Sequence, residues 1–439
     1  MTAFNHFKPL IISTLGNCIE WYDFMVYAAL APIIATIFFP SQQGVNALLE
    51  TYGLFAIGFI ARPFGALLFG FLGDRFGRRY ALLLAISLMT VPTFLIGCLP
   101  TYATIGLWAP LALLLCRLLQ GLALSGEMPG CITFLSESAP LRLQTTLTSL
   151  AIVASLIGLL VGANGILYLD YQFGTTAVQS HLWRIPFLMA GAFGVIVYYL
   201  RRHLPETPAF LKQTHACQQP IRTCLRFHWR AIVQGIGCYA GNAIYFYFFM
   251  VFSLTYFYRL SHIPLHRALL FTISLQVAML IMIPVGGYLA DRYGRRKIGL
   301  IFLIIILIST YGTMIFMSQV SHYPLNAALF GLFMIAALIA GYSATLPALV
   351  ASLFPIDVRF TGVAIVNNSA VTLFGGLSPL LITYLISTQH SLSVPMWPIM
   401  ACTGISILSF WLFASASHDA LANNRERQRS LIKPLPCED

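Results

Sequence analysis

The sequence predicts an all-α membrane protein in which twelve transmembrane helices form two six-helix bundles. Three observations lead to this fold class: an apolar composition, twelve apolar runs of membrane-spanning length, and an internal repeat. Of the 439 residues, 58% are hydrophobic and only 9% are charged. A water-soluble protein of this length could not bury so much apolar surface, because the buried fraction rises only slowly with chain length. A bilayer removes the problem by covering the apolar faces with lipid.

The apolar runs reach the length of about 20 residues that crosses a hydrocarbon core. They lie at 10–38, 51–72, 80–99, 108–136, 145–169, 184–202, 231–258, 268–289, 298–318, 324–353, 362–386 and 395–417. The longest polar interruption begins at Arg201 and ends at Arg230. We therefore expect an N-terminal bundle at 1–203, a cytoplasmic linker at 204–230, a C-terminal bundle at 231–417 and a cytoplasmic tail at 418–439.

The positive charges indicate the orientation of the chain. With the N-terminus in the cytoplasm, the outside loops and their flanks hold only Arg184, Arg259 and Arg267, while the inside loops hold most of the other lysines and arginines. This bias predicts that the N- and C-termini are both cytoplasmic. The net charge of +11 is spread over separate loops, so it indicates no continuous groove for nucleic acid.

An internal repeat relates the two halves of the chain. GDRFGRR at 73–79 recurs as ADRYGRR at 290–296, each time after the second apolar run of its half. Asp74 and Asp291 are 217 residues apart, and so are Arg142 and Arg359 in the loops after the fourth run of each half. Parallel six-helix repeats related by an axis along the membrane normal are an architecture of transporters.

These features resemble the major facilitator superfamily, whose best-known signature is matched by GDRFGRR and its copy. Further segments are similar to one branch, the metabolite:proton symporters, which includes proline/betaine, α-ketoglutarate, citrate and shikimate carriers. They are GNCIEWYDF (16–24), RPFGALLFGFLGDRFGRR (62–79), RLLQGLALSGE (117–127), WRIPF (183–187), ETPAF (206–210) and FPIDVRFTG (354–362). The resemblance implies the major facilitator fold, with import by alternating access between the two bundles. We expect a multi-pass protein of the bacterial inner membrane.

Five ionisable residues lie inside apolar runs and far from the ends of those runs: Glu20, Asp23, Arg62, Arg117 and Glu127. An ionisable group in hydrocarbon costs several kcal/mol unless it is paired or faces a water-filled cavity, so each is a functional candidate. At about 1.5 Å per residue, Asp23, Arg62 and Arg117 lie roughly 20, 17 and 14 Å into their runs, near the midplane.

The spacing of these residues suggests their roles. Glu20 and Asp23 are three residues apart and share a helix face, where mutual repulsion favours protonation of one carboxylate. We predict that Asp23, with Glu20 or Glu127, carries the proton. Arg62 and Arg117 stay protonated, so they bind a substrate carboxylate or pair with the acids. The alternative is that all five residues form internal salt bridges that only hold helices together.

The two signature loops are a candidate conformational latch, as the resemblance implies. Glycine permits a tight turn, a carboxylate is stabilised at a helix N-terminus, and the arginines can reach Glu137. The predicted latch residues are Gly73, Asp74, Gly77, Arg78, Arg79, Glu137, Arg142, Asp291, Arg295, Arg296 and Arg359. The alternative is that the arginines only set the orientation of the chain.

The second half has no carboxylate inside an apolar run. Its candidate substrate-binding residues are Asn242, Tyr245, Gln276, Asn367 and Asn368, although such amides also join helices to each other. The aromatic run YFYFFMVF from Tyr245 could form a cation–π wall for a quaternary ammonium, or it could simply pack in the core or against lipid.

No motif of an enzyme is present: the sequence contains no phosphate loop, nucleophile elbow or HExxH, and no cysteine spacing typical of a metal site. We predict a proton-coupled symporter of a small carboxylate or zwitterionic osmolyte such as proline or betaine, without cofactor, metal, nucleic acid or obligate protein partner. A proton-driven exporter of a drug or siderophore and a non-transporting nutrient sensor are the alternatives.

Overall fold

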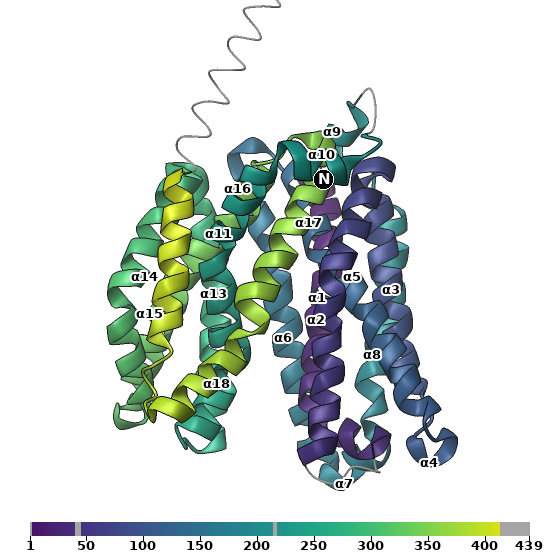
Figure 1. Cartoon of the computed structure of the whole chain (residues 1–439), viewed down its shortest axis with the longest axis vertical. Coiled ribbons are helices and arrows are strands. Elements are labelled where there is room, and N and C mark those ends of the chain that lie inside the picture. Colours follow the sequence, from purple (N-terminus) through teal and green to yellow (C-terminus); the bar gives the residue numbers. More distant parts are fainter. Residues whose placement is uncertain (1, 40–44, 214–216, 413–439) are drawn as a thin grey trace, which may run out of the picture.

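The computed structural model describes residues 2–39, 45–213 and 217–412, and within these ranges the side chains of 7–39, 61–174, 176–213 and 217–412. The described chain contains helices and turns but no strand (Figure 1). Ten helices of this part are long and apolar enough to cross a membrane. The predicted all-α membrane fold is confirmed at this level. The count of twelve spans and the orientation of the termini stay predictions.

The first half of the chain consists of long helices joined by short connections. They are α1 (Thr2–Phe38), α2 (Val45–Phe76), α3 (Arg78–Cys98), α5 (Trp108–Ser138), α6 (Gln144–Phe173) and α8 (Arg184–Arg202). The short helices between them are α4 (Tyr102–Ile105), η1 (Leu141–Leu143), α7 (Thr175–Ala177) and η2 (Val178–Leu182). Two further short helices follow, α9 (Pro208–Leu211) and α10 (Pro220–Phe227).

The second half has more interrupted helices. Its first long segment comprises α11 (Trp229–Tyr245), η3 (Phe246–Phe252), α12 (Ser253–Thr255) and η4 (Tyr256–Leu260). Then come α13 (Leu265–Tyr293), α14 (Arg295–Ser318), η5 (Val320–His322), α15 (Leu325–Ser343), α16 (Leu346–Ala351), η6 (Ile356–Val358), α17 (Arg359–Ala370), η7 (Val371–Gly376), α18 (Ser378–Gln389) and an apolar helix at Met396–Leu412. The segments η3, η4 and η7 are π-helical, a geometry often found at functional sites.

The two repeat loops break their helices at equivalent positions. Gly77 has φ of 109° and Gly294 has φ of 99°, a region that side chains disfavour and glycine adopts without steric cost. Gly77 is the single residue between α2 and α3, and Gly294 is the single residue between α13 and α14. The two glycines are 217 residues apart. The internal repeat of the sequence is thus also a repeat of backbone conformation.

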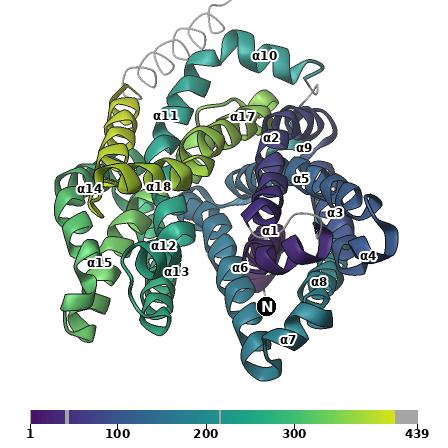
Figure 2. The same cartoon turned by 60° about the horizontal axis from the view of Figure 1, so that its bottom comes forward.

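The helices of the first half gather on one side of the molecule and those of the second half on the other (Figures 1 and 2). The two sides meet where α2 packs against α17 and α6 packs against α13. Helices α9 and α10 lie at the end of the molecule that also carries the start of α17 (Figure 1). Polar side chains from the two halves meet where these helices pack against each other.

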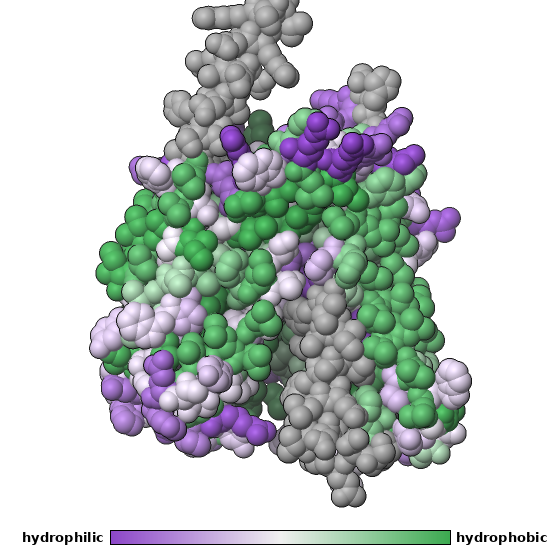
Figure 3. All heavy atoms as spheres, in the orientation of Figure 1, coloured by the Kyte–Doolittle hydropathy of each residue, from purple (hydrophilic) through white to green (hydrophobic). Residues whose placement is uncertain are grey.

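The outer surface is largely apolar around the middle of the molecule and more polar at its two ends (Figure 3). Large hydrophobic side chains such as Phe64, Val195, Ile308 and Leu380 are exposed. Such a surface would be unfavourable in water but is covered by lipid in a membrane. The protein is a multi-pass membrane protein.

Candidate functional site

A central cavity of about 50 Å³ lies between the two sides of the molecule. Its lining comes from α1, α2, α5 and α6 of the first half and from α11, η3, α17 and η7 of the second. The lining residues are Glu20, Trp21, Arg62, Met128, Ile132, Ile152, Tyr239, Asn242, Ala243, Phe246, Tyr247, Asn367 and Val371. A cavity built jointly by both halves is what a binding site for alternating access requires.

The cavity holds opposite charges. Glu20 and Arg62, which are 2% and 3% exposed, belong to α1 and α2 and both line it. Arg62 also reaches across to the second half, since its Nε donates to Asn368 Oδ1 at 3.0 Å. A buried acid and a buried base in one cavity match the two charges of a zwitterion.

Aromatic rings form one part of the wall. The centroid of Trp21 lies 4.8 Å from that of Phe246 and 6.3 Å from that of Tyr247. Of the predicted aromatic run, Phe246 and Tyr247 face this cavity, whereas Tyr245 and Phe249 line a separate small cavity beside α14 and α15. Only part of the run is therefore placed to contact a bound cation.

Asp23 and Arg117 form a buried ion pair within the first half. Arg117 Nη1 lies 3.2 Å from Asp23 Oδ2, and Gln120 donates to the same oxygen at 3.1 Å. The Arg117 guanidinium also stacks over the Tyr27 ring, 3.5 Å from its centroid. Gln120 further donates to Thr93 at 2.7 Å. Neither Asp23 nor Arg117 lines the central cavity, whereas Glu20, the other candidate proton carrier on α1, does. The Asp23–Arg117 pair is therefore separate from the candidate substrate site.

Glu127 pairs with Arg201, a partner that the sequence pattern does not predict. Arg201 Nη1 donates to Glu127 Oε2 at 2.8 Å and to the carbonyl of Leu82 at 3.2 Å, and Nη2 donates to Glu127 Oε1 and to the carbonyl of Ser13. The sequence places Arg201 at the start of the polar interruption, but its side chain is fully buried. The sequence does contain a signal for this pair. A buried Glu127 carboxylate requires a cationic partner, and Arg201 lies within the apolar run 184–202.

The other predicted substrate-binding residues occupy different positions. Asn242 and Asn367 line the cavity. Asn368 bonds Arg62, Ser125 and Ala364. Outside the cavity, Gln276 donates to the carbonyl of Met250 at 2.8 Å, and the Tyr245 hydroxyl bonds Thr403. The structure thus brings Asn242 and Asn367 together with Glu20 and Arg62, and it gives Asn368, Gln276 and Tyr245 bonds between helices.

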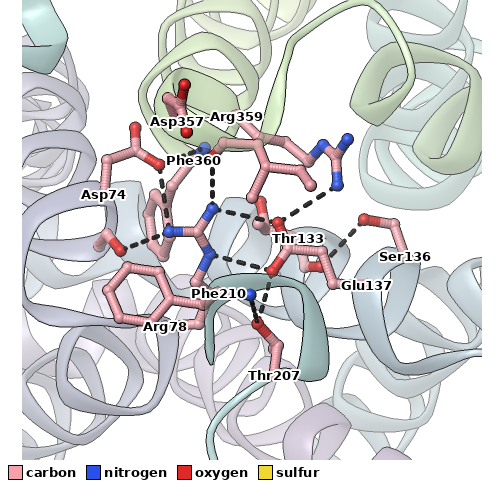
Figure 4. A network of polar contacts seen from close by, with 12 residues as sticks. Asp74, Arg78, Thr133, Ser136, Glu137, Thr207, Phe210, Asp357, Arg359 and Phe360 are labelled. Carbon is pink, nitrogen blue, oxygen red and sulfur yellow. Dashed lines mark hydrogen bonds and ion pairs between the residues drawn. The ribbon is translucent and has the colours of Figure 1, made fainter. Parts of the chain in front are cut away.

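A second polar cluster surrounds Glu137 at the end of the molecule near α9 (Figure 4). Arg78 donates to both carboxylate oxygens of Glu137 at 3.0 Å, and Arg359 of the second half donates at 3.3 Å. The Thr207 hydroxyl, which precedes α9, donates at 2.6 Å. Glu137 therefore binds the first half, the second half and the linker at once. Thr207 is a further member that the sequence pattern does not identify.

The two repeat aspartates each cap a helix of the opposite half. Asp74 accepts from the backbone N–H groups of Phe360 and Thr361, at 3.1 and 2.8 Å, at the start of α17. Asp291 accepts from those of Thr145 and Thr146, at 2.8 and 2.9 Å, at the start of α6. A carboxylate at a helix N-terminus satisfies unpaired N–H groups and is stabilised by the helix dipole. Both contacts join the halves.

The arginines of the predicted latch differ in their contacts. Arg295 donates to Thr145 at 2.8 Å and to Gln144 at 2.5 Å, across the halves. Arg79 and Arg296 bond within their own half, to Arg202 and Phe410. The Arg142 side chain is exposed and makes no hydrogen bond or ion pair with another described residue. Gly73 accepts from Arg78 through its carbonyl at 2.9 Å, beside Gly77 in the turn.

Comparison with known families identifies the architecture. The family described as Sugar (and other) transporter matches residues 9–230, and the Major Facilitator Superfamily matches residues 238–436. The chain belongs to the major facilitator superfamily. It is a secondary transporter.

Relatives within the superfamily match most of this transporter. The proline/betaine transporter of Salmonella typhimurium is 31% identical over 417 residues, covering 92% of this chain and 82% of the relative. The transporter OusA of Dickeya dadantii, named for glycine betaine, proline, ectoine and pipecolic acid, is 30% identical with the same coverage. The predicted resemblance to proline/betaine carriers is thereby confirmed.

Solved structures show the same fold. The proton:xylose symporter XylE bound to 6-bromo-6-deoxy-D-glucose has a TM-score of 0.74 at 17% identity, over 94% of this chain and 96% of that one. A bacterial homologue of the iron transporter ferroportin in an outward-facing state has a TM-score of 0.68 at 14% identity, over 93% and 99% of the two chains. These likenesses establish the major facilitator fold.

Proposed function

We propose that this transporter imports a small zwitterion, of the proline or glycine betaine type, together with protons. The observation that carries the proposal is the central cavity, which is built by both halves and holds Glu20, Arg62 and an aromatic wall. The names of the relatives support the substrate class. A zwitterion has one group for each charge in the cavity, whereas a simple dicarboxylate would leave Glu20 facing a like charge.

The substrate carboxylate would bind the Arg62 guanidinium, which presents N–H donors suited to a carboxylate. The cationic nitrogen would lie near Glu20 and against the rings of Trp21, Phe246 and Tyr247. A cation over an aromatic face gains about 0.5–2 kcal/mol, more when water is excluded. Binding of both ends of the substrate by these groups would orient it between the two halves.

The proton would be carried by Asp23, with Glu20 or Glu127 as further acids. Protonation of Asp23 would remove the charge that Arg117 neutralises, 3.2 Å away. A buried charge that loses its partner is strongly destabilised, so Arg117 would then have to move or find another acceptor. This would link the state of the proton site to the packing of α1 against α5.

Alternating access would require breaking the cross-half contacts made by Asp74, Glu137, Asp291 and Arg295. We propose that these residues, with the rest of the predicted latch, hold the cytoplasmic side closed. In this arrangement, bundles at 1–203 and 231–417 cross the bacterial inner membrane twelve times, with both termini in the cytoplasm and no enzymatic activity. The tail at 418–439 lies outside the described residues.

The test uses purified protein in proteoliposomes with an imposed pH gradient, acidic outside. Radiolabelled proline and glycine betaine should accumulate above equilibrium, and a protonophore should abolish the accumulation. Equal rates with and without the gradient would contradict proton coupling. Substrate efflux against a proton influx would favour the exporter, and ligand binding without flux would favour the sensor.

A further inference from the structure

A surface groove lies between α10 and the end of α2. Helix α10 lies at the outer edge of the molecule, where it packs on α2 of the first half and on η6 and α17 of the second (Figure 2). Three of the residues that line the groove are apolar: Phe71 from α2, and Ile221 and Leu225 from α10. Arg222 and Arg226 of α10 line it as well. The groove thus combines apolar and cationic groups, and none of its residues belongs to the central cavity.

The positive charges at this groove are not balanced by acidic side chains. Arg75, near the end of α2, lies over the Phe71 ring, with its guanidinium carbon 5.3 Å from the ring centroid. Arg75, Arg222 and Arg226 are exposed, and none of them forms an ion pair with another residue of the described ranges. Arg222 donates a long hydrogen bond to Gln219 at 3.5 Å. Three exposed cations around one groove attract an anion.

Hydropathy and an exposed tryptophan place the groove at the boundary of the membrane. The apolar run 51–72 ends one residue after Phe71, and the run 231–258 begins two residues after Trp229. Trp229 is 54% exposed, and the Arg230 guanidinium lies over its ring at 5.5 Å. Tryptophan is enriched where the hydrocarbon core meets water. This is the side predicted to be cytoplasmic, and the cytoplasmic leaflet carries anionic lipids.

An apolar stripe leads from the groove along α2. Phe64, Leu67 and Leu68 are exposed by 68%, 37% and 41%. They precede Phe71 by seven, four and three residues, so all four side chains share one face of the helix. An acyl chain attached to a headgroup in the groove could therefore follow α2 into the membrane along apolar side chains.

We infer that this groove binds an anionic phospholipid, with the phosphate on Arg222 and Arg226 and an acyl chain along the exposed stripe of α2. Arginine suits this role, because its planar guanidinium donates paired hydrogen bonds to phosphate oxygens. A soluble anion would match the arginines but leave Phe71 and Leu225 uncovered, and a zwitterionic lipid would bring a cation of its own. Since α10 packs on both halves, the bound lipid would lie beside their junction.

The experiment compares phosphatidylglycerol with phosphatidylcholine of the same acyl chains, mixed in equal amounts with the purified full chain in detergent. Native mass spectrometry measures how many molecules of each lipid the protein retains. An arginine at an anionic surface contributes about fivefold in affinity, so two should favour phosphatidylglycerol roughly 25-fold. Equal retention of the two lipids would overturn the inference. Displacement by sodium phosphate beyond that by sodium chloride of equal ionic strength would assign the groove to a free anion and would also overturn it.

The double variant Arg222→Gln with Arg226→Gln should lose this preference. The matched control is Arg202→Gln with Lys212→Gln, which removes two exposed charges outside the groove and should keep the preference. All four side chains are exposed, so both double variants should fold. A preference that survives in the first variant, or that falls equally in the control, would contradict the site. The readout is lipid binding, and it is therefore independent of the proposed substrate and of proton coupling.

Discussion

Arg62 on α2 donates its Nε hydrogen to Asn368 on α17 over 3.0 Å, and so links a cavity residue to the opposite half. Asn368 uses its other end to donate to the carbonyls of Ser125 and Ala364, at 3.1 and 2.9 Å. Ser125 in turn donates to the carbonyl of Arg62 at 2.8 Å. The amide of Asn368 thus joins α17 to α2 and α5. A movement of the Arg62 side chain on substrate binding would therefore directly alter a contact of α17.

Replacing Asn368 by Asp should slow the transport cycle. An aspartate at this position would form an ion pair with Arg62, a stronger contact than the present bond from the guanidinium to a neutral amide. We propose that opening of one side of the transporter breaks this contact, so we expect the maximal uptake rate to fall at least severalfold with a smaller change in the apparent KM. Asn368→Ala, which loses the contact, should favour opening. An unchanged rate in Asn368→Asp would show that this contact does not break during transport.

Replacing Asp23 by Asn should uncouple transport from the proton gradient. Asparagine keeps the size of the side chain but cannot exchange a proton, so facilitated exchange should persist while gradient-driven accumulation is lost. The measurement is the ratio of substrate uptake with an imposed pH gradient to uptake without it. Asp170→Asn, an exposed acid at the end of α6, is the control and should stay coupled. Normal accumulation by Asp23→Asn would remove Asp23 from the mechanism.

Replacing Asp74 by Asn should weaken closure of the cytoplasmic side. The substitution removes the charge that the N-terminus of α17 stabilises, an effect of about 0.3–2 kcal/mol. Spin labels at the exposed residues Leu141, at the start of η1, and Tyr293, at the end of α13 in the opposite half, should report a larger share of long distances, and the transport rate should fall. Asp357→Asn, an exposed acid that bonds Gln213, is the control. A transport rate equal to that of the unaltered protein would contradict the latch.

Removing one member of the Glu127–Arg201 pair should destabilise the fold more than removing both. An uncompensated buried charge costs about 3–5 kcal/mol, whereas replacement of a whole pair by neutral groups is often close to neutral. Thermal unfolding in detergent should therefore rank Arg201→Met well below the double variant Glu127→Gln with Arg201→Met. Additive effects of the two substitutions would contradict a direct buried pair.

Several features of the site could be predicted from residue type and spacing. The offset of 217 residues relates Asp74 to Asp291, and both aspartates cap helices of the opposite half. The same offset relates Glu137 to Phe354, so the cluster around Glu137 has no counterpart in the second half. The position of Glu20 and Arg62 inside apolar runs, far from the ends of those runs, indicated two residues that do line the central cavity. Their roles in transport stay predictions.

Other features depend on how helices rotate and pack. Glu127 was predicted, as an alternative to Glu20, to carry the proton with Asp23, but the structure joins it to Arg201, 74 residues away in sequence. Asp23 is only three residues from Glu20, yet it turns toward Arg117 and away from the cavity. Depth along a helix follows from the rise per residue, whereas the direction of a side chain depends on the faces of its neighbours.

The sequence by itself determined the membrane environment, the two related halves and the identity of the buried charges, because these follow from hydropathy, repetition and composition. Only the tertiary structure decided which charges pair within one half and which face the space between the halves. The reason is physical: hydrocarbon requires every buried charge to find a partner or a cavity, but it does not say which one, and that choice is made by helix packing between residues distant in sequence.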